Sequence, residues 1–318
     1  MRKVVFLMPY GRLVFRKIRS FYKKIRRSPP YFLVFLFGRF IWVRLSFSHL
    51  SKPDQKAQQL FNQNSDSLFS DLDSKTIVTL LQKHGIFEGI LLPEEIREDI
   101  LEYVDSHDCF IDGKVDQGFK ISEKDQVEAI YGRSFYVARY FNTSTTCTGI
   151  SKLANDPKFW EIATQYIGKA AKYTGASLYW TFPLHDTSKP YEFSQFHYDL
   201  EDYNSLRFCF YLTDVHSDSG PHVCIQGSHR RKPIKSIFNY FSRIFPEEKL
   251  IEFYGFETFN YLIGKAGFGF IEDVFCFHRG AIPVHEPRLF LQLHFATNNY
   301  VEHQYHDHRD PKTLKSIF

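Results

Sequence analysis

The chain is 318 residues long and 43% apolar, so it can bury the core of one large domain or of two small ones. Its formal net charge of +4 hides an asymmetry, because residues 1–53 contain 13 Lys/Arg and no acid, whereas the remaining 27 Lys/Arg face all 36 acids, a balance near −9. The five cysteines have no spacing typical of a zinc knuckle or a disulfide framework. This composition favours a reducing, cytoplasmic location.

Residues 1–53 are predicted to form a basic, partly apolar N-terminal arm. The apolar run Tyr31–Val43 contains Gly38 and Arg39 and is shorter than the roughly 20 residues that a spanning helix needs. A basic stretch followed by an aromatic one is typical of a segment at an anionic membrane surface, with the protein peripheral to that membrane. The alternative is a helix that packs on the core. Nucleic acid is not expected as a partner, because no recognition module accompanies the basic residues.

Residues 54–175 are predicted to be a mainly helical region that packs on the core. A polar linker, Ser51–Ser74, is followed by helical spacing up to His84, and Gly85 is a plausible stop. Leu92-Pro93-Glu94-Glu95 is typical of a helix start, with proline in the first turn and acids at the positive end of the dipole. Asn155–Tyr173 has apolar positions at helical spacing.

Residues 176–300 change to short segments that are rich in aromatic and β-branched residues and bounded by Gly, Pro, Asp or Ser, as strands are. The predicted strands are Ser177–Phe182, Glu192–His197, Leu206–Thr213, His222–Ile225, Phe268–Phe277 and Arg288–Thr297. Residues 232–259 interrupt them as a helical insertion, and residues 301–318 are predicted to be a polar tail. Helices followed by strands indicate an α+β fold, and closure of the strands into a jelly-roll barrel protects their edges.

A possible metal site lies in Gln195-Phe196-His197-Tyr198-Asp199. On a strand, His197 and Asp199 point to the same face and can converge on one ion. His278, 81 residues downstream of His197, completes a set of two imidazoles and one carboxylate, the facial triad of a non-heme Fe(II) that keeps open coordination positions. Taken alone, the His-x-Asp pattern also fits a buried histidine that is hydrogen-bonded to a neighbouring aspartate.

Three segments, in order, resemble the phytanoyl-CoA dioxygenase family of Fe(II)/2-oxoglutarate-dependent oxygenases, over roughly residues 179–296. The matching segments are His197-Tyr198-Asp199, then Leu212-Thr213-Asp214 with Ser219-Gly220-Pro221-His222-Val223 and Gly227-Ser228-His229-Arg230, then Phe277-His278-Arg279-Gly280 with Pro287-Arg288-Leu289. The resemblance implies a double-stranded β-helix of the jelly-roll or cupin-like type. It also implies Fe(II) on His197, Asp199 and His278, and a structural role for the Gly-Ser-His segment.

The resemblance further implies 2-oxoglutarate and O2 as cosubstrates, with ascorbate as a reductant. Arg288 is expected to hold the distal carboxylate of 2-oxoglutarate, because a guanidinium matches a carboxylate with two parallel hydrogen bonds. Strand alternation puts Arg288, Phe290, Gln292 and His294 on one face, which should point into the barrel. From their positions, Thr181, Tyr179 and Tyr211 are candidates for further contacts with the cosubstrate.

The expected function is hydroxylation of a small-molecule, lipid-linked or sugar-linked substrate, and desaturation or ring formation through the same chemistry stays open. The carboxylate of Asp199 separates this chain from related halogenases, which need that coordination position for a halide. Two alternatives remain: a protein or peptide hydroxylase, and a catalytically silent barrel that acts as a binding module. Specificity in such folds resides in loops, so residues 232–259 and the region before residue 179 are expected to form the substrate pocket.

Overall fold

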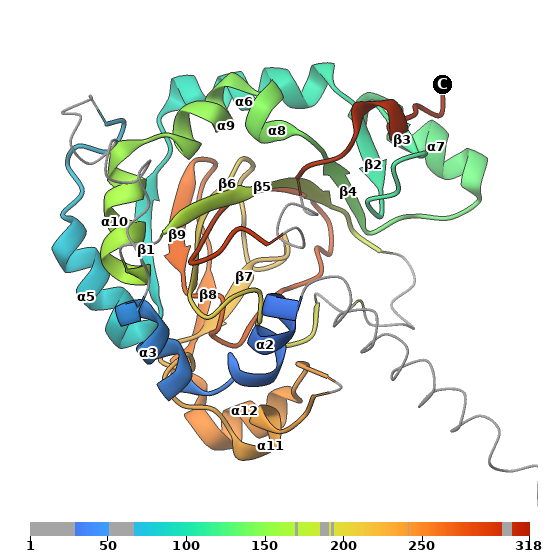
Figure 1. Cartoon of the computed structure of the whole chain (residues 1–318). Coiled ribbons are helices and arrows are strands. Elements are labelled where there is room, and N and C mark those ends of the chain that lie inside the picture. Colours follow the sequence, from blue (N-terminus) through green and yellow to red (C-terminus); the bar gives the residue numbers. More distant parts are fainter. Residues whose placement is uncertain are drawn as a thin grey trace, which may run out of the picture.

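The computed structural model describes residues 29–50, 67–168, 171–184, 191, 194–240, 242–300 and 307–318, with backbone alone for residues 48–50. Its strands form two antiparallel sheets (Figure 1). The larger contains β1 (Ile86–Leu91), β2 (Cys109–Ile111), β3 (Gly118–Phe119), β4 (Val137–Tyr140), β5 (Lys172–Thr181), β6 (Ser205–Tyr211), β9 (Phe268–Glu272) and β11 (Arg288–Ala296). The smaller contains β7 (His222–Ile225), β8 (Phe259–Leu262) and β10 (His278–Gly280). The strand orders are β1-β9-β6-β11-β5-β4-β2-β3 and β10-β7-β8.

The central strand β11 explains why the larger sheet has two different faces. Leu289, Leu291 and Leu293 belong to the apolar cluster shared with the helices, whereas Gln292 and His294 line a cavity on the opposite face. A second cluster joins this inner face to β7, β8 and the segment before β10, so the two sheets pack face to face. The predicted alternation of β11 is therefore confirmed. A closed double-stranded β-helix stays a prediction.

Helices cover the outer face of the larger sheet (Figure 1). They are α5 (Ser74–His84), α6 (Glu94–Ser106), α7 (Lys124–Tyr131), α8 (Thr143–Thr146), α9 (Thr148–Ala154) and α10 (Pro157–Ile167), with the 3-10 turn η2 (Ile121–Glu123). Local sequence sets their ends. The Asp73 side chain accepts a hydrogen bond from the backbone N–H of Lys75, and Gly85 ends α5 at a φ of 77°. Asp156 caps α10, and Pro157 occupies its first turn.

Near the smaller sheet lie α2 (Pro29–Phe37), α3 (Ile41–Leu50), α11 (Ile234–Ile237) and α12 (Glu247–Tyr254) (Figure 1). The described part of the arm packs on the core: Val34 is fully buried, and the Phe47 ring stacks on that of Tyr203 with centroids 3.7 Å apart. The packing alternative for Tyr31–Val43 is therefore observed. Residues 1–28, on which the predicted membrane contact mainly rests, lie outside the described residues. Within those residues, no helix has the length and apolar character needed to cross a membrane.

Two strand predictions are wrong in part. In the described portion of Glu192–His197, only His197 pairs, in a single bridge with His278, because a turn closed by the Ser194 N–H to Tyr191 O bond precedes it. The predicted strand Phe268–Phe277 ends at Glu272. There the Asp273 side chain accepts a hydrogen bond from the Phe275 backbone N–H at 2.9 Å. The Asp273 backbone carbonyl accepts a second hydrogen bond, from the Cys276 backbone N–H. This turn ends β9, and the next strand, β10, begins only at His278.

Several other elements of the structure were not predicted from the sequence. β1 to β4 extend the larger sheet within the region predicted to be mainly helical, and β8 begins at Phe259, the last residue of the predicted insertion. That insertion contains α11, α12 and η4 (Phe256–Thr258). The described end of the polar tail includes η5 (Pro311–Thr313). It is not simply solvated, because buried Asp307 accepts hydrogen bonds from the Thr143 backbone and hydroxyl.

Candidate metal and cosubstrate site

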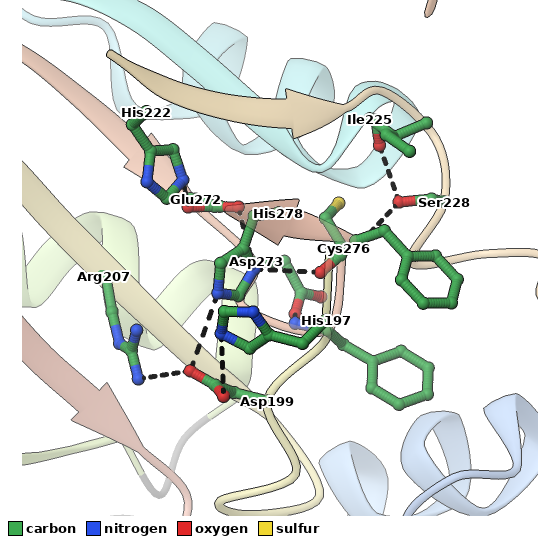
Figure 2. Close-up of polar contacts among 12 residues, drawn as sticks. His197, Asp199, Arg207, His222, Ile225, Ser228, Glu272, Asp273, Cys276 and His278 are labelled. Atoms are coloured by element: carbon green, nitrogen blue, oxygen red, sulfur yellow. Dashed lines mark hydrogen bonds and ion pairs between the residues drawn. The ribbon is translucent and has the colours of Figure 1, made fainter. Parts of the chain in front are cut away.

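The three predicted ligands converge, as Figure 2 shows. One ligand atom from each of His197, Asp199 and His278 lies within 4.8 Å of the others. Nε2 of His197 is 3.9 Å from Oδ1 of Asp199, and Nε2 of His278 is 3.7 Å from Oδ2. The backbone brings the two histidines together, because the His197 N–H donates to the His278 carbonyl at 3.0 Å and the reverse bond is 2.8 Å.

The second nitrogen of each histidine fixes its tautomer. Nδ1 of His197 lies 2.8 Å from the Gln195 carbonyl, and Nδ1 of His278 lies 3.0 Å from the Cys276 carbonyl. A carbonyl oxygen only accepts, so Nδ1 carries the proton and Nε2 presents its lone pair. Burial, with the nearby His197, lowers the pKa of His278 to about 3, although Glu272 and Asp199 oppose the shift. The neutral form that a metal requires is therefore favoured.

Asp199 is held as a carboxylate by Arg207. Nη2 of Arg207 donates to Oδ2 of Asp199 at 2.7 Å (Figure 2). The same nitrogen donates to Glu201 at 2.6 Å. Burial would raise the pKa of Asp199, but the positive charge of Arg207 and the two histidines hold it below its ordinary value. Arg207 therefore fixes one carboxylate oxygen while the other faces His197.

A second buried carboxylate, Glu272, stands behind His278. Its Oε1 is 3.4 Å from Nδ1 of His278, and its Oε2 is 2.7 Å from Nε2 of His222 (Figure 2). Since Nδ1 of His278 already donates to the Cys276 carbonyl, Glu272 acts on this imidazole through its negative charge, which raises the basicity of the ring. In this arrangement His222 is engaged with Glu272, whereas His197 and His278 present Nε2 toward Asp199.

The Gly-Ser-His segment supports the site rather than joining it. The Ser228 hydroxyl donates to the Ile225 carbonyl at 2.6 Å and accepts from the Phe277 backbone N–H at 2.8 Å (Figure 2). It thereby fixes the residue before His278. His229 packs elsewhere, with Nε2 3.2 Å from the Gln82 carbonyl. The expected structural role of this segment agrees with these contacts.

The ligands lie in a cavity of about 280 Å³ that both sheets line. Arg288 lies on its wall, and an Arg288 guanidinium nitrogen donates to the Gly220 carbonyl. Its Nε is buried and makes no hydrogen bond within the described part of the chain. A buried N–H donor without a partner is costly, and a guanidinium that lines the cavity matches a carboxylate, so this arginine fits a carboxylate ligand.

The other predicted cosubstrate residues differ in position. Thr181 lines the cavity, and its register partner across β5 and β11 is Arg288. Tyr179, two residues before Thr181 on β5, also lines the cavity. The Tyr211 hydroxyl instead donates to the Leu262 carbonyl and accepts from the His222 N–H, both at 2.9 Å. A contact between Tyr211 and a cosubstrate would have to replace these bonds, and it stays a prediction.

Sequence reasoning missed several polar residues of the cavity. Besides Arg207, they include Tyr31 from α2, Arg139 from β4 and Arg243 from the segment between α11 and α12. Arg207 had a usable signal, because it alternates with Cys209 and Tyr211 on a predicted strand. Tyr31, Arg139 and Arg243 had none, because their elements were not expected at the cavity.

No family model and no curated protein sequence matches this chain. Among solved structures, one similar fold is the non-heme alpha ketoglutarate dependent epimerase SnoN from nogalamycin biosynthesis, with 14% identity, 70% of this chain and 82% of that chain covered, and a TM-score of 0.49. Another is HygX from Streptomyces hygroscopicus with nickel, 2-oxoglutarate and hygromycin B bound, with 13% identity, 70% and 86% covered, and a TM-score of 0.46. A third is the carbocyclase SnoK from nogalamycin biosynthesis, with 14% identity, 73% and 87% covered, and a TM-score of 0.45.

Proposed function

We propose that this chain is an Fe(II)- and 2-oxoglutarate-dependent oxygenase of the phytanoyl-CoA dioxygenase type, built on a double-stranded β-helix, that hydroxylates a small molecule. The observation that carries this proposal is the convergence of the His197, Asp199 and His278 ligand atoms within 4.8 Å, in the same cavity as Arg288. Two imidazoles and one carboxylate suit a non-heme Fe(II), because such an ion needs open positions for oxygen and a cosubstrate.

Bound iron and 2-oxoglutarate would supply the oxidative chemistry, with O2 as the oxidant and ascorbate as a reductant. The residues of the chain bind and orient these groups. His197, Asp199 and His278 would hold the metal through two Nε2 atoms and one carboxylate oxygen. Arg288 would pair with the distal carboxylate of 2-oxoglutarate, and Thr181 lies beside it in register. Arg207 keeps Asp199 charged and fixed in orientation, because its Nη2 donates a hydrogen bond to Oδ2 of that carboxylate.

Succinate release from 2-oxoglutarate tests the proposal. Purified protein with Fe(II) and ascorbate should release succinate across a metabolite panel, and His278→Ala should reduce that release to background and remove metal binding. His285→Ala is the matched control, because His285 is an exposed histidine in the same part of the chain. Turnover retained in His278→Ala would show that the ligand assignment is wrong. Wild-type protein that binds neither metal nor 2-oxoglutarate would favour the silent binding module.

A further inference from the structure

The cavity contains more positive charge than the proposed chemistry uses. Among the described residues, four arginines line it, Arg139, Arg207, Arg243 and Arg288, together with two carboxylates, Asp199 and Glu201. Arg207 bonds to both carboxylates. If the proposed function holds, Arg288 is occupied by 2-oxoglutarate, and the two charges of Fe(II) are balanced by those of the 2-oxoglutarate dianion. Over these described residues the balance is then positive by two charges, or by one when buried Glu272 behind the wall is included, and Arg139 and Arg243 are the two arginines that the proposed chemistry does not use.

Arg139 comes from the larger sheet. Its guanidinium carbon lies 4.8 Å from the centre of the Tyr179 ring, and β4 pairs with β5 so that these two residues are opposite each other. Burial, and the positive charges of Arg207 and Arg309, lower the pKa of Arg139. An anion beside Arg139 would offset both the burial and the like charges.

Arg243 comes from a different wall, in the segment between α11 and α12. It is half-buried, and its charge is among those that lower the pKa of Asp199. Tyr31, on α2, lines the same cavity, and its ring contacts that of Tyr300 with centroids 5.7 Å apart. The insertion and the N-terminal helices thus reach the site together, and this is the part of the fold expected to set specificity.

We propose that the substrate carries a carboxylate or phosphate group, and that Arg139 and Arg243, which line the same cavity from different elements, bind this anion. The inference rests on the proposed function, because it assigns the substrate class of the same site. Guanidinium groups match both anions with paired, charge-assisted hydrogen bonds. A cleft lined with excess charge of one sign also concentrates ligands of the opposite charge. The cavity volume of about 280 Å³ suits a small molecule, or the reacting end of a longer one.

Anion binding measured by calorimetry tests this directly. Protein loaded with Mn(II), which prevents turnover, and saturated with 2-oxoglutarate is titrated with inorganic phosphate and, separately, with acetate; the tighter anion identifies the group. At least one should bind saturably. Arg139→Gln and Arg243→Gln should each weaken it about tenfold, the scale of one charge-assisted hydrogen bond. Arg97→Gln, an arginine bonded to Glu94 on the outer helix α6, should bind like the wild type.

The outcomes separate this inference from the function on which it rests. If Mn(II) and 2-oxoglutarate bind normally but neither anion does, or if both glutamine variants bind as the wild type does, the inference fails alone. If 2-oxoglutarate abolishes anion binding, Arg288 was the site and the inference also fails. If metal and 2-oxoglutarate do not bind, the proposed function fails. Titration of metal-free protein with the same anions then still tests whether Arg139 and Arg243 bind them. Arg243 is half-buried, so its substitution should not disturb the fold. Arg243→Gln therefore tests the inference even if Arg139→Gln does not fold.

Substrate pairs give a second readout. Succinate release is compared for carboxylic acids and their methyl esters, and for phosphate monoesters and the parent alcohols. The anionic member should stimulate release more strongly, and Arg243→Lys should retain more of that stimulation than Arg243→Gln because the charge remains. Neutral members that stimulate equally well would overturn the inference.

Discussion

At the scale of single residues, the charge of the outer carboxylate Glu272 is expected to affect how strongly His278 binds a metal. It lies 3.4 Å from Nδ1 of that ligand and is itself almost fully buried. Glu272→Gln removes the negative charge that makes the imidazole a stronger donor, so we expect metal affinity to fall about 10- to 100-fold. Titration with Mn(II) measures this. Glu257→Gln, on an exposed turn, is the control, and equal affinities in both variants would show that Glu272 has no role at the metal.

Arg288 gives a second prediction at this scale. Arg288→Lys keeps the charge but loses the planar pair of donors, so the Michaelis constant for 2-oxoglutarate should rise about tenfold or more while metal affinity changes little. Steady-state succinate release and Mn(II) titration separate the two effects. Arg133→Lys, on the exposed surface, should leave both constants unchanged. An unchanged Michaelis constant in Arg288→Lys would mean that another residue holds the carboxylate.

The sequence was informative about residues that lie in short motifs. His197 and Asp199 are two positions apart, and His278 and Arg288 follow within one recognisable segment, so their convergence was predictable. Arg139 and Arg243 reach the cavity from β4 and from the segment between α11 and α12. Their roles depend on which strands pair and how the insertion folds back, and no local pattern encodes either.

At the scale of elements, a buried ion pair anchors α3. Arg44 and Asp273 lie 3.1 Å apart, with about 5% of each side chain exposed, and the Tyr166 hydroxyl also donates to Asp273. Arg44→Ala leaves a buried carboxylate without its main partner, so the free energy of unfolding should fall by about 3–5 kcal/mol. Denaturant unfolding measures this. Trp42→Ala on the same helix, where the side chain is 67% exposed, should change stability by less than about 0.5 kcal/mol.

The same aspartate predicts a pH dependence. Burial would raise the pKa of Asp273, but Arg44, His229 and the Tyr166 hydroxyl hold it below its ordinary 3.8. Below pH 3.8 the unfolded chain therefore binds the proton more readily than the folded one. The contribution of Asp273 to stability is complete above pH 3.8 and is lost as the pH falls through the lower, folded-state value. Denaturant unfolding between pH 6 and pH 3 should show a smaller acid loss in Asp273→Asn, and identical losses would contradict the prediction.

Element prediction succeeded where local signals were complete. α5 and α10 have a capping aspartate and an apolar stripe, and β11 alternates cleanly. It failed where a segment forms a strand only because of its pairing partners. β1 pairs with β9, and β4 pairs with β5 and β2. The short β10 pairs with β7, and its first residue, His278, also bridges to His197. Long-range contacts of this kind leave no periodicity in a short segment.

At the scale of the whole molecule, residues of both sheets line a polar cavity, and Tyr31 on the N-terminal helix α2 lines it too. Composition predicted the division between a basic arm and an acidic remainder. It did not predict that the arm divides again, with residues 29–47 packed on the core through Val34, Arg39 and Arg44. The Arg39 guanidinium donates to the Ile237 and Asn239 carbonyls, which ties α2 and α3 to the insertion. A deletion that tests membrane binding should therefore stop before residue 29.

Residues 1–28 contain ten Lys/Arg and no acid, so their removal takes away most of the charge of the arm and leaves the packed helices in place. Attraction to anionic lipid is worth about 1 kcal/mol per cation near the surface and decays within a Debye length. We therefore expect the full chain to sediment with anionic liposomes at low salt and to be released as salt rises, whereas the 1–28 deletion stays in solution. Neutral liposomes are the control. Exposed Trp42 and Leu45 on α3 should add salt-resistant binding, which Trp42→Ala would reduce. Full-length protein that ignores anionic liposomes at low salt would rule out the membrane surface as a partner.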